Sequence, residues 1–169
     1  MVIRRLVPAD AADYRALRLR GLAENPDAFT SSADAEAAKP LAVVEARIAP
    51  DSPDVIYGAF VGETLAGTVG LALEPRAKSR HKGKVIGMYV APEFRRRGIA
   101  RALLRHLIAV ARQERELEQL VLTVTHSNES ARLLYESEGF RSFGIEPRAI
   151  RVANRYFDKN HMVLFFAPA

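Results

Sequence analysis

A change of hydrophobic period around residues 91–98 most constrains the fold of this chain. Upstream, the segment 85–90 is mostly apolar, which predicts a buried strand over residues 84–90. Downstream, apolar residues recur with the spacing of one helix face, at Leu103, Leu104, Leu107, Ile108 and Ala111. The chain therefore passes almost directly from a central strand into an amphipathic helix that begins near Gly98.

Positive charge surrounds the start of this helix, in the run Arg95, Arg96, Arg97, Gly98, Ile99 and Ala100. The first N–H groups of a helix have no intrahelical partner, and together with the helix dipole they can bind an anion. Glycine lets the backbone approach such a ligand closely. The arrangement suits a pyrophosphate, although clustered arginines are also typical of a solvated face, a nucleic-acid patch or a tail. The run has neither the G-x-G-x-x-G spacing nor the Gly-Lys-Ser/Thr of a P-loop.

A second passage from strand to helix follows the first. Residues 120–124 predict another apolar strand, and Ser127 or Asn128 can cap a helix after it. Gly139 suits the end of that helix, because a left-handed residue commonly terminates helices.

Together the two passages resemble the GNAT superfamily of acyl-CoA-dependent N-acetyltransferases. The family's R/Q-x-x-G-x-G/A pyrophosphate loop matches Arg95, Gly98 and Ala100. Its later N-x-x-A-x-x-L-Y-x-x-x-G-F segment matches Asn128, Ala131, Leu134, Tyr135, Gly139 and Phe140. The resemblance runs from about Ile3 to Phe166, and most of its specificity lies in the central third. It implies an α/β fold: a mixed, mostly antiparallel sheet with splayed central strands and helices on both faces.

The resemblance also implies a mechanism in which the acceptor amine attacks the thioester of acetyl-CoA directly, without an acetyl-enzyme. Tyr135 matches the family's general acid for the departing thiolate, and an amide near Val90 would be the oxyanion donor. Asn128 would contact the pantetheine or a nearby main-chain carbonyl. The residues implied to bind the cofactor are Met88, Tyr89, Val90, Arg95, Arg96, Arg97, Gly98, Ile99, Ala100, Arg101, Asn128 and Tyr135.

The general base is not identified by the sequence. The predicted central strand, 84–90, contains no carboxylate, which leaves Glu74, Glu36, His126 or a chain of water molecules. Arg101 and Arg132 are candidate partners for the ribose phosphate of coenzyme A, but each taken alone is more typical of an exposed surface arginine.

In the resembled family, the acceptor site is built from segments that correspond here to residues 25–39 and 146–160. The side chains there offer two chemistries. Arg148, Arg151 and Arg155 suit an acceptor carboxylate, whereas Asp34, Glu36 and Asp158 suit an amine. A solvated hairpin is the alternative for each of them. A small primary amine, an amino acid or a polyamine is favoured as acceptor over a peptide N-terminus or lysine. A catalytically quiet acyl-CoA-binding or nucleic-acid-binding regulatory module is the alternative function.

The remaining pattern predicts the order of elements. Strands are expected at 2–6, 55–61, 65–74, 140–145 with an extension at 149–152, and 161–166. Helices are expected at 8–22 and 33–48, the second broken at Lys39-Pro40, with turns between them at 25–32. A tight turn is expected at Ala153-Asn154, with the asparagine in the left-handed conformation.

Length and composition favour one soluble domain over residues 1–169. The absence of cysteine excludes disulfides and thiolate catalysis, and the scattered histidines indicate no metal site. No apolar run spans a bilayer and no secretory h-region begins the chain, so we expect a cytoplasmic protein without membrane contact. Acidic residues are interspersed among the basic ones despite the net charge of +5, and this pattern disfavours nucleic acid as a partner. The resemblance suggests a homodimer through the last strands.

Overall fold

The strands of the protein form one sheet. The computed structural model describes residues 1–166, and in that range the seven strands follow the order β1-β2-β3-β4-β5-β7-β6. They are β1 (Val2–Arg5), β2 (Asp54–Val61), β3 (Thr64–Leu73), β4 (Lys82–Val90), β5 (Gln119–Thr125), β6 (Arg141–Val152) and β7 (Arg155–Phe165). Among the strands of residues 1–166, only β4 and β5 pair in parallel. The predicted mixed, mostly antiparallel sheet is confirmed. The predicted domain 1–169 includes residues 167–169, which lie outside the described residues, and it stays a prediction.

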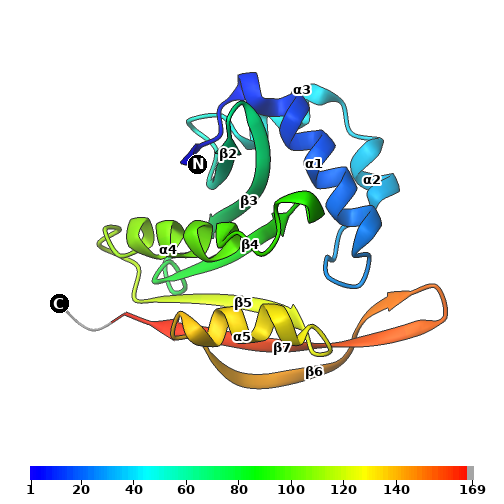
Figure 1. Ribbon diagram of the computed structural model, residues 1–169. Coiled ribbons are helices and arrows are strands. Elements are labelled where there is room, and N and C mark those ends of the chain that lie inside the picture. Colours follow the sequence, from blue (N-terminus) through cyan, green and yellow to red (C-terminus); the bar gives the residue numbers. More distant parts are fainter. Residues whose placement is uncertain (167–169) are drawn as a thin grey trace.

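Helices cover both faces of this sheet (Figure 1). They are α1 (Ala11–Glu24), α2 (Ala33–Ala37), α3 (Leu41–Arg47), α4 (Ile99–Ala111) and α5 (Glu129–Ser137), with short 3-10 turns η1 (Pro8–Asp10) and η2 (Pro92–Phe94). Tyr14 of α1 packs in one hydrophobic cluster and Leu103 of α4 in another. Leu65 and Ala66 are adjacent on β3 and belong to different clusters, because successive strand residues point to opposite faces.

The two central strands separate part of the way along the sheet. The pairing of β4 with β5 ends at Lys84 and Val121, and beyond this point the strands diverge (Figure 1). In β4, Gly87 has a φ of +59°, and the register with β3 shifts there. The Thr68 hydroxyl donates a hydrogen bond to the Gly87 carbonyl at 3.1 Å, which holds this irregularity in place. The predicted splay of the central strands is therefore present.

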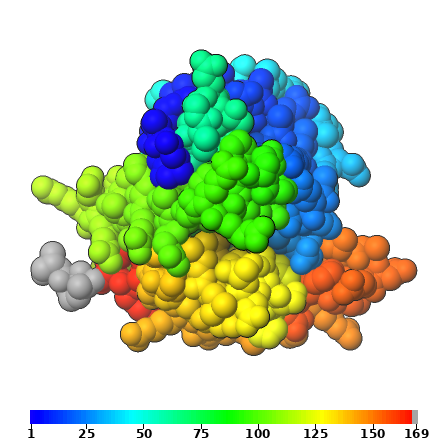
Figure 2. Space-filling model, viewed as in Figure 1, coloured from blue at the N-terminus to red at the C-terminus, as the bar shows by residue number. Residues whose placement is uncertain are grey.

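The C-terminal hairpin is longer than the sequence indicated. β6 is one strand over Arg141–Val152, although its register with β7 is irregular between Glu146 and Ile150. β7 begins at Arg155, well before the predicted start at residue 161. This end of the hairpin protrudes from the body of the molecule (Figure 2). Because it covers no core, its residues show no apolar alternation that would reveal a strand.

The turn of this hairpin corrects one detail of the prediction. The turn lies at Ala153-Asn154 as expected, but Ala153 has the positive φ, +51°, and Asn154 does not. The first predicted helix also differs, because Pro8–Asp10 form a 3-10 turn before α1 begins at Ala11. The helical break at Pro40 is confirmed, since this residue is the N-cap of α3.

Candidate active site

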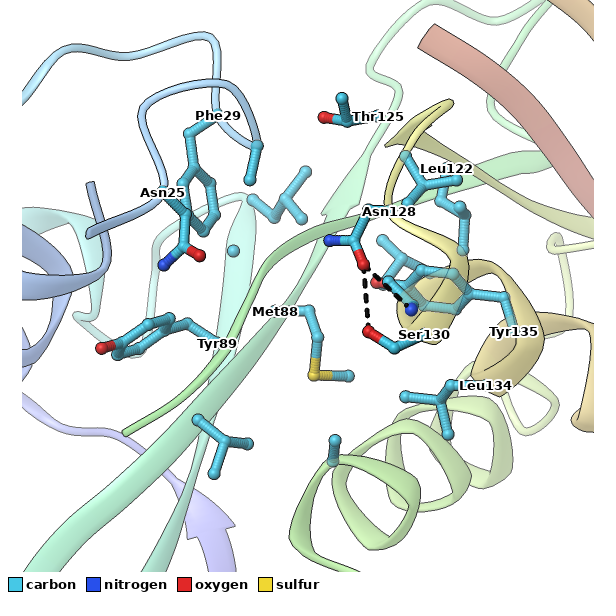
Figure 3. Close-up of a pocket in the computed structure, with 18 of the residues that line it drawn as sticks. Asn25, Phe29, Met88, Tyr89, Leu122, Thr125, Asn128, Ser130, Leu134 and Tyr135 are labelled. Carbon is cyan, nitrogen blue, oxygen red and sulfur yellow. Dashed lines mark hydrogen bonds between the residues drawn. The ribbon is translucent and has the colours of Figure 1, made fainter. Parts of the chain in front are cut away.

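A cavity of about 820 Å³ lies where β4 and β5 separate. The second half of β4, the loop after it and the first turn of α4 form part of its wall, and β5 and α5 form another part. The loop between α1 and α2 supplies a third part, with Asn25 and Phe29 facing the residues of α5 across the cavity (Figure 3). Within residues 1–166, no helix is long and apolar enough to cross a membrane.

The N-terminus of α4 opens into this cavity without a side-chain cap. Gly98 is the N-cap, with a φ of +76°, and no side chain accepts a hydrogen bond from the first turn. A Cβ atom at Gly98 would meet no protein atom within 4 Å, so the space beside it is open. Arg96 is also left-handed, with a φ of +58°. Backbone of this kind turns successive N–H groups toward one concave surface, which suits a phosphate.

The side chains of the arginine run differ in what they contact. The Arg95 Nε donates to the Val90 carbonyl at 3.0 Å, so this side chain braces the end of β4. Arg97 lies 5.5 Å from the Phe94 ring centroid and is not among the residues that line the cavity. Arg96 lines the cavity, and no ion pair to its guanidinium is found within residues 1–166. The main chain of this loop and Arg96 are therefore the best placed to contact a phosphate.

The two candidate partners of the ribose phosphate are both ion-paired. Arg101 lines the cavity, but its Nε lies 3.3 Å from the Glu138 carboxylate. Arg132 pairs within α5 with Glu129 and Glu136 and does not line the cavity.

Met88, Tyr89 and Val90 line the cavity, and their contact with the pantetheine stays a prediction. The Tyr89 side chain, however, turns to α1, where its hydroxyl donates to Glu24 Oε2 at 2.7 Å. Burial and this hydrogen bond raise the pKa of Tyr89 to about 12. Arg20 also donates a hydrogen bond to Glu24, and this bond is the main reason why the pKa of Glu24 lies below its usual value. The Tyr89 hydroxyl therefore serves to join β4 to α1 through Glu24.

Tyr135 is the other tyrosine that lines the cavity. Its ring is 7% exposed and packs edge-on against Phe140, and its hydroxyl end points toward the middle of the cavity (Figure 3). No hydrogen bond to this hydroxyl is found within residues 1–166. Burial raises the pKa of Tyr135 to about 12, so the phenol holds its proton throughout the neutral range. A neutral phenol facing a cavity can donate a proton there.

Asn128 caps α5, as the sequence predicted. Its Oδ1 accepts hydrogen bonds from the Ala131 N–H and the Ser130 hydroxyl, each at 3.1 Å. Because the oxygen is used in this way, the amide nitrogen points into the cavity toward Met88 (Figure 3). It is placed to donate a hydrogen bond to a ligand.

None of the three candidate base side chains lines the cavity. Glu74 and His126 are exposed. Glu36 is 3% exposed, and its carboxylate receives Lys39 at 2.9 Å and Arg18 at 2.9 Å. Burial works to raise the pKa of Glu36, but Lys39 and Arg18 together hold that pKa below its usual value. Such a carboxylate is a weak proton acceptor.

The acceptor residues proposed from sequence are only partly brought to the cavity. From the first predicted segment, Asn25, Ala28, Phe29, Thr30 and Ser31 line it. No residue of 146–160 does. Asp34 does not line it either. Arg148, Arg151 and Arg155 stack on aromatic rings of their own hairpin, and Asp158 accepts a hydrogen bond from the Arg148 N–H.

Sequence reasoning missed Arg18 and Arg47, which line the cavity from α1 and α3. Neither residue belongs to a recognisable motif.

A buried lysine holds the α1–α2 loop in place beside the cavity. The Lys159 Nζ donates three hydrogen bonds: to the carbonyls of Asp27 and Ala28 at 2.9 Å each, and to the Thr125 hydroxyl at 2.8 Å. The Thr125 hydroxyl in turn donates to the Asp27 carbonyl at 2.7 Å. Lys159 is 5% exposed, and its burial lowers its pKa from the ordinary 10.5. The loop that carries Phe29 is thus joined to β5 and β7.

Splayed central strands, the cavity between them and the open helix N-terminus at its wall together define an acyltransferase. The sequence profile of the acetyltransferase (GNAT) family matches residues 21–140, well over half of the chain. The chain belongs to this family. The family's use of acetyl-CoA fits the uncapped start of α4 at Gly98 and the residues of β4 that line the cavity.

Two curated relatives are similar to the chain. They are N-alpha-acetyltransferase 30 of Xenopus laevis and of Homo sapiens, each 32% identical over 88 residues. The match covers 52% of this chain, 32% of the Xenopus protein and 24% of the human protein. The chain therefore spans about a third or less of the length of the curated relatives it matches.

Solved structures share the fold along nearly the whole chain. A GNAT-family acetyltransferase from Streptococcus pneumoniae has a TM-score of 0.88 at 24% identity, covering 98% of this chain and 99% of that one. A ribosomal-protein-alanine N-acetyltransferase from Brucella melitensis has a TM-score of 0.81 at 23% identity, with 98% and 100% coverage. The yncA protein of Salmonella typhimurium, solved with acetyl-CoA, has a TM-score of 0.80 at 22% identity, with 100% and 98% coverage.

Proposed function

We propose that this protein transfers the acetyl group of acetyl-CoA directly to the primary amine of a small acceptor. The observation that carries the proposal is the placement of Tyr135, whose free hydroxyl points into the same cavity that the α4 N-terminus opens into. One end of the cavity thus suits the phosphates of a cofactor, and a proton donor lies within reach of its interior.

Acetyl-CoA supplies the thioester, and the protein's residues supply its orientation and one proton. N–H groups of the α4 first turn and Arg96 bind the pyrophosphate, while the main chain of Met88 and Val90 and the Asn128 amide hold the pantetheine. The acceptor nitrogen forms its bond to the carbonyl carbon as the carbon–sulfur bond breaks. Tyr135 gives its proton to the sulfur and is reprotonated from water. An amide near Val90 stabilises the charge that develops on the carbonyl oxygen.

We propose water as the acceptor of the amine proton. Among residues 1–166, none of the side chains that line the cavity belongs to Asp, Glu or His. The protein then selects an acceptor that is already deprotonated, so kcat/KM should rise with pH up to the ordinary pKa of the acceptor amine. The predicted water chain is favoured over Glu74, Glu36 and His126 for this reason.

A peptide N-terminus is a second candidate acceptor. The names of the curated relatives and of the Brucella melitensis neighbour favour it. The match to the curated relatives covers about half of this chain, however, and the structural likeness carries only the fold. Peptides therefore belong in the test beside small amines.

The experiment measures release of the coenzyme A thiol from acetyl-CoA with amines, amino acids, polyamines, aminoglycosides and short peptides. A thermal-shift titration with acetyl-CoA accompanies it. Turnover with one class of amine establishes the reaction and its acceptor class. Stabilisation by acetyl-CoA without thiol release from any acceptor would instead support a quiet acyl-CoA-binding module. An affinity for nucleic acid that falls steeply with salt would support the nucleic-acid alternative.

A cytoplasmic location and a homodimer stay predictions. Sedimentation of the purified protein at several concentrations tests the second. The exposed face of β6, which includes Phe143 at 62% and Ile145 at 53% exposure, is the surface on which such a dimer would form.

A further inference from the structure

The charges that line the cavity are all of one sign. Six basic side chains line it, from Arg18, Arg47, Lys84, Arg95, Arg96 and Arg101. No acidic side chain within residues 1–166 does so. A cavity with this lining favours negatively charged ligands and disfavours cationic ones.

The phosphates of acetyl-CoA account for only part of this charge. Arg95, Arg96 and Arg101 lie at the start of α4, beside the anion site. Arg18 and Arg47 belong to α1 and α3, which cover the opposite face of the sheet from α4. They line the cavity together with the Phe29 loop. Positive charge therefore also lies at the end of the cavity where the acceptor must enter.

The buried carboxylate near these two arginines neutralises them only in part. Glu36 lies 2.9 Å from Arg18, 2.9 Å from Lys39 and 3.9 Å from Arg47, so three cations surround one anion. The Nε atoms of Arg18 and Arg47 are buried, and neither has a hydrogen-bond partner within residues 1–166. Arg18 Nε lies 2.9 Å from Glu36 Oε1, so this carboxylate is its charge partner, whereas Arg47 is only loosely paired with it. The Arg47 side chain is 27% exposed and its nearest contact to Glu36 is 3.9 Å, so its guanidinium is the less fully neutralised of the two.

We propose that the acceptor carries a carboxylate in addition to its primary amine, and that Arg18 and Arg47 bind this carboxylate. The proposal rests on the proposed acetyltransferase function and adds the chemical class of its acceptor. A guanidinium presents paired N–H donors in a planar arrangement that matches a carboxylate, so two of them can fix its orientation. Phe29 and the aliphatic side chains around it provide an apolar wall for the remainder of an amino acid.

This assignment differs from what the hairpin arginines suggested. Arg148, Arg151 and Arg155 do not line the cavity, so the acceptor carboxylate is assigned to α1 and α3 instead. It also distinguishes amino acids from polyamines and aminoglycosides, which the proposed function includes together as possible acceptors. An amino acid brings a carboxylate to Arg18 and Arg47, whereas polyamines and aminoglycosides bring further positive charge to a cavity that basic side chains line.

The test compares acceptors that differ only in the carboxylate. Phenylalanine, phenylalaninamide and phenethylamine share one side chain, and thiol release is measured for each at matched concentrations of free amine. We expect kcat/KM to be at least about tenfold higher for the amino acid than for either neutral analogue, as expected for one charge-assisted contact. Aspartyl and glutamyl peptide amides form an additional arm, which distinguishes a free amino acid from an acidic peptide side chain as the source of the carboxylate.

Arg47 is the residue to change, because Arg18 is more tightly paired with buried Glu36. Arg47→Gln should reduce the ratio of amino acid to amide toward one, and Arg47→Lys should restore part of it. Arg15→Gln is the matched control, since Arg15 is on α1 and contacts the Ala37 carbonyl but does not line the cavity. The control should keep the wild-type ratio. Thermal unfolding of each variant shows whether it is folded.

A binding measurement gives a readout that does not need turnover. In the presence of coenzyme A, the amino acid should raise the melting temperature of the wild-type protein but not that of Arg47→Gln. Faster acetylation of polyamines, or equal rates for the amino acid and its amide, would overturn the inference while leaving the acetyltransferase function intact. Thiol release from none of the amines would overturn the proposed function. An amino-acid-induced shift that persists in Arg47→Gln would overturn the assignment to Arg47.

Discussion

The two ends of the cavity are built from different parts of the protein. The end that we propose for acetyl-CoA, the cofactor end, consists of one continuous segment, from Met88 on β4 to the first turn of α4, together with α5. The contacts that we propose for it come largely from the main chain, with Arg96 and Asn128 as additional side-chain donors. The acceptor end consists of side chains from α1, the α1–α2 loop and α3, and its loop is held by Lys159 from β7. The first end is thus local in sequence, and the second depends on tertiary contacts.

This difference explains how one fold can serve many acceptors. Backbone N–H groups bind phosphate whatever the neighbouring side chains are, so the cofactor end needs little more than Gly98 and an uncapped helix. The acceptor end has no such constraint, and its side chains can change without disturbing the sheet. We therefore expect substitutions at the two ends to separate acetyl-CoA binding from acceptor binding.

Tyr135 belongs to the chemistry between the two ends, and its substitution should give the largest effect. Tyr135→Phe keeps the ring against Phe140 but removes the only group proposed to protonate the leaving sulfur. We expect kcat to fall by about 10²-fold, with little change in the affinity for acetyl-CoA. Steady-state thiol release and a cofactor titration measure the two quantities.

Tyr57→Phe is the matched control for this change. Tyr57 is 9% exposed, lies on β2 and does not line the cavity. Removing its hydroxyl should leave kcat as it is. The pKa of Tyr135, about 12, also predicts that its proton loss contributes no basic limb to the wild-type rate profile below pH 10. Full turnover in Tyr135→Phe would make Tyr135 a packing residue.

Gly98 is the residue whose change should disable the cofactor end alone. Gly98→Leu places a side chain at a φ of +76°, in the open space that we assign to the pyrophosphate. We expect the dissociation constant of acetyl-CoA to rise by about tenfold or more, equivalent to about 1.4 kcal/mol. Isothermal titration calorimetry measures this constant.

Gly62→Leu separates loss of the ligand site from simple backbone strain. Gly62 lies in the β2–β3 turn with a φ of +61°, and a Cβ there also meets nothing within 4 Å. A leucine in the left-handed region costs about 1–2 kcal/mol at either position. Both variants should therefore lose similar stability, and only Gly98→Leu should lose cofactor affinity. An equal loss of affinity in both would remove the pyrophosphate assignment.

Features that depend on residues close in the chain could be predicted from the sequence, and features that depend on tertiary contacts could not. The predicted passage from β4 into α4 and the Asn128 cap are confirmed, because each depends on residues close in the chain. The Arg18 and Arg47 pair could not be predicted, since it requires α1 and α3 to meet around Glu36. The start of β7 at Arg155 was missed for another reason. The outer part of the β6–β7 hairpin covers no core, so no hydrophobic period marks it.

The Lys159 contacts allow the acceptor end to be disturbed without touching a lining side chain. Lys159→Met keeps the length of the side chain but removes the lysine's hydrogen bonds to the carbonyls of Asp27 and Ala28, of which only Asp27 keeps the Thr125 hydroxyl as a donor. We expect the free energy of unfolding to fall by about 1 kcal/mol, because burial of the ammonium offsets part of the hydrogen-bond energy. The acceptor KM should rise through the looser Phe29 loop, with acetyl-CoA affinity unchanged.

The matched control for Lys159→Met is Lys78→Met. Lys78 is exposed, and no hydrogen bond or ion pair to its ammonium is found within residues 1–166. Its replacement should change neither stability nor the acceptor KM. If Lys159→Met leaves both quantities at their wild-type values, the lysine does not position the loop.

The smallest effect that we expect is a pH dependence that Lys159 gives to stability. Burial lowers the pKa of Lys159 in the folded protein below the 10.5 of the unfolded chain. Between these two values the unfolded chain binds the proton and the folded protein does not, so stability contributed by this group rises with pH. Below the lower pKa both states are charged, and the contribution is constant.

Subtracting the stability of Lys159→Met from that of the wild type removes the contributions of all other titrating groups. The difference should therefore increase as the pH approaches 10.5. A difference that decreases instead would mean that the three hydrogen bonds raise the pKa of Lys159 more than burial lowers it.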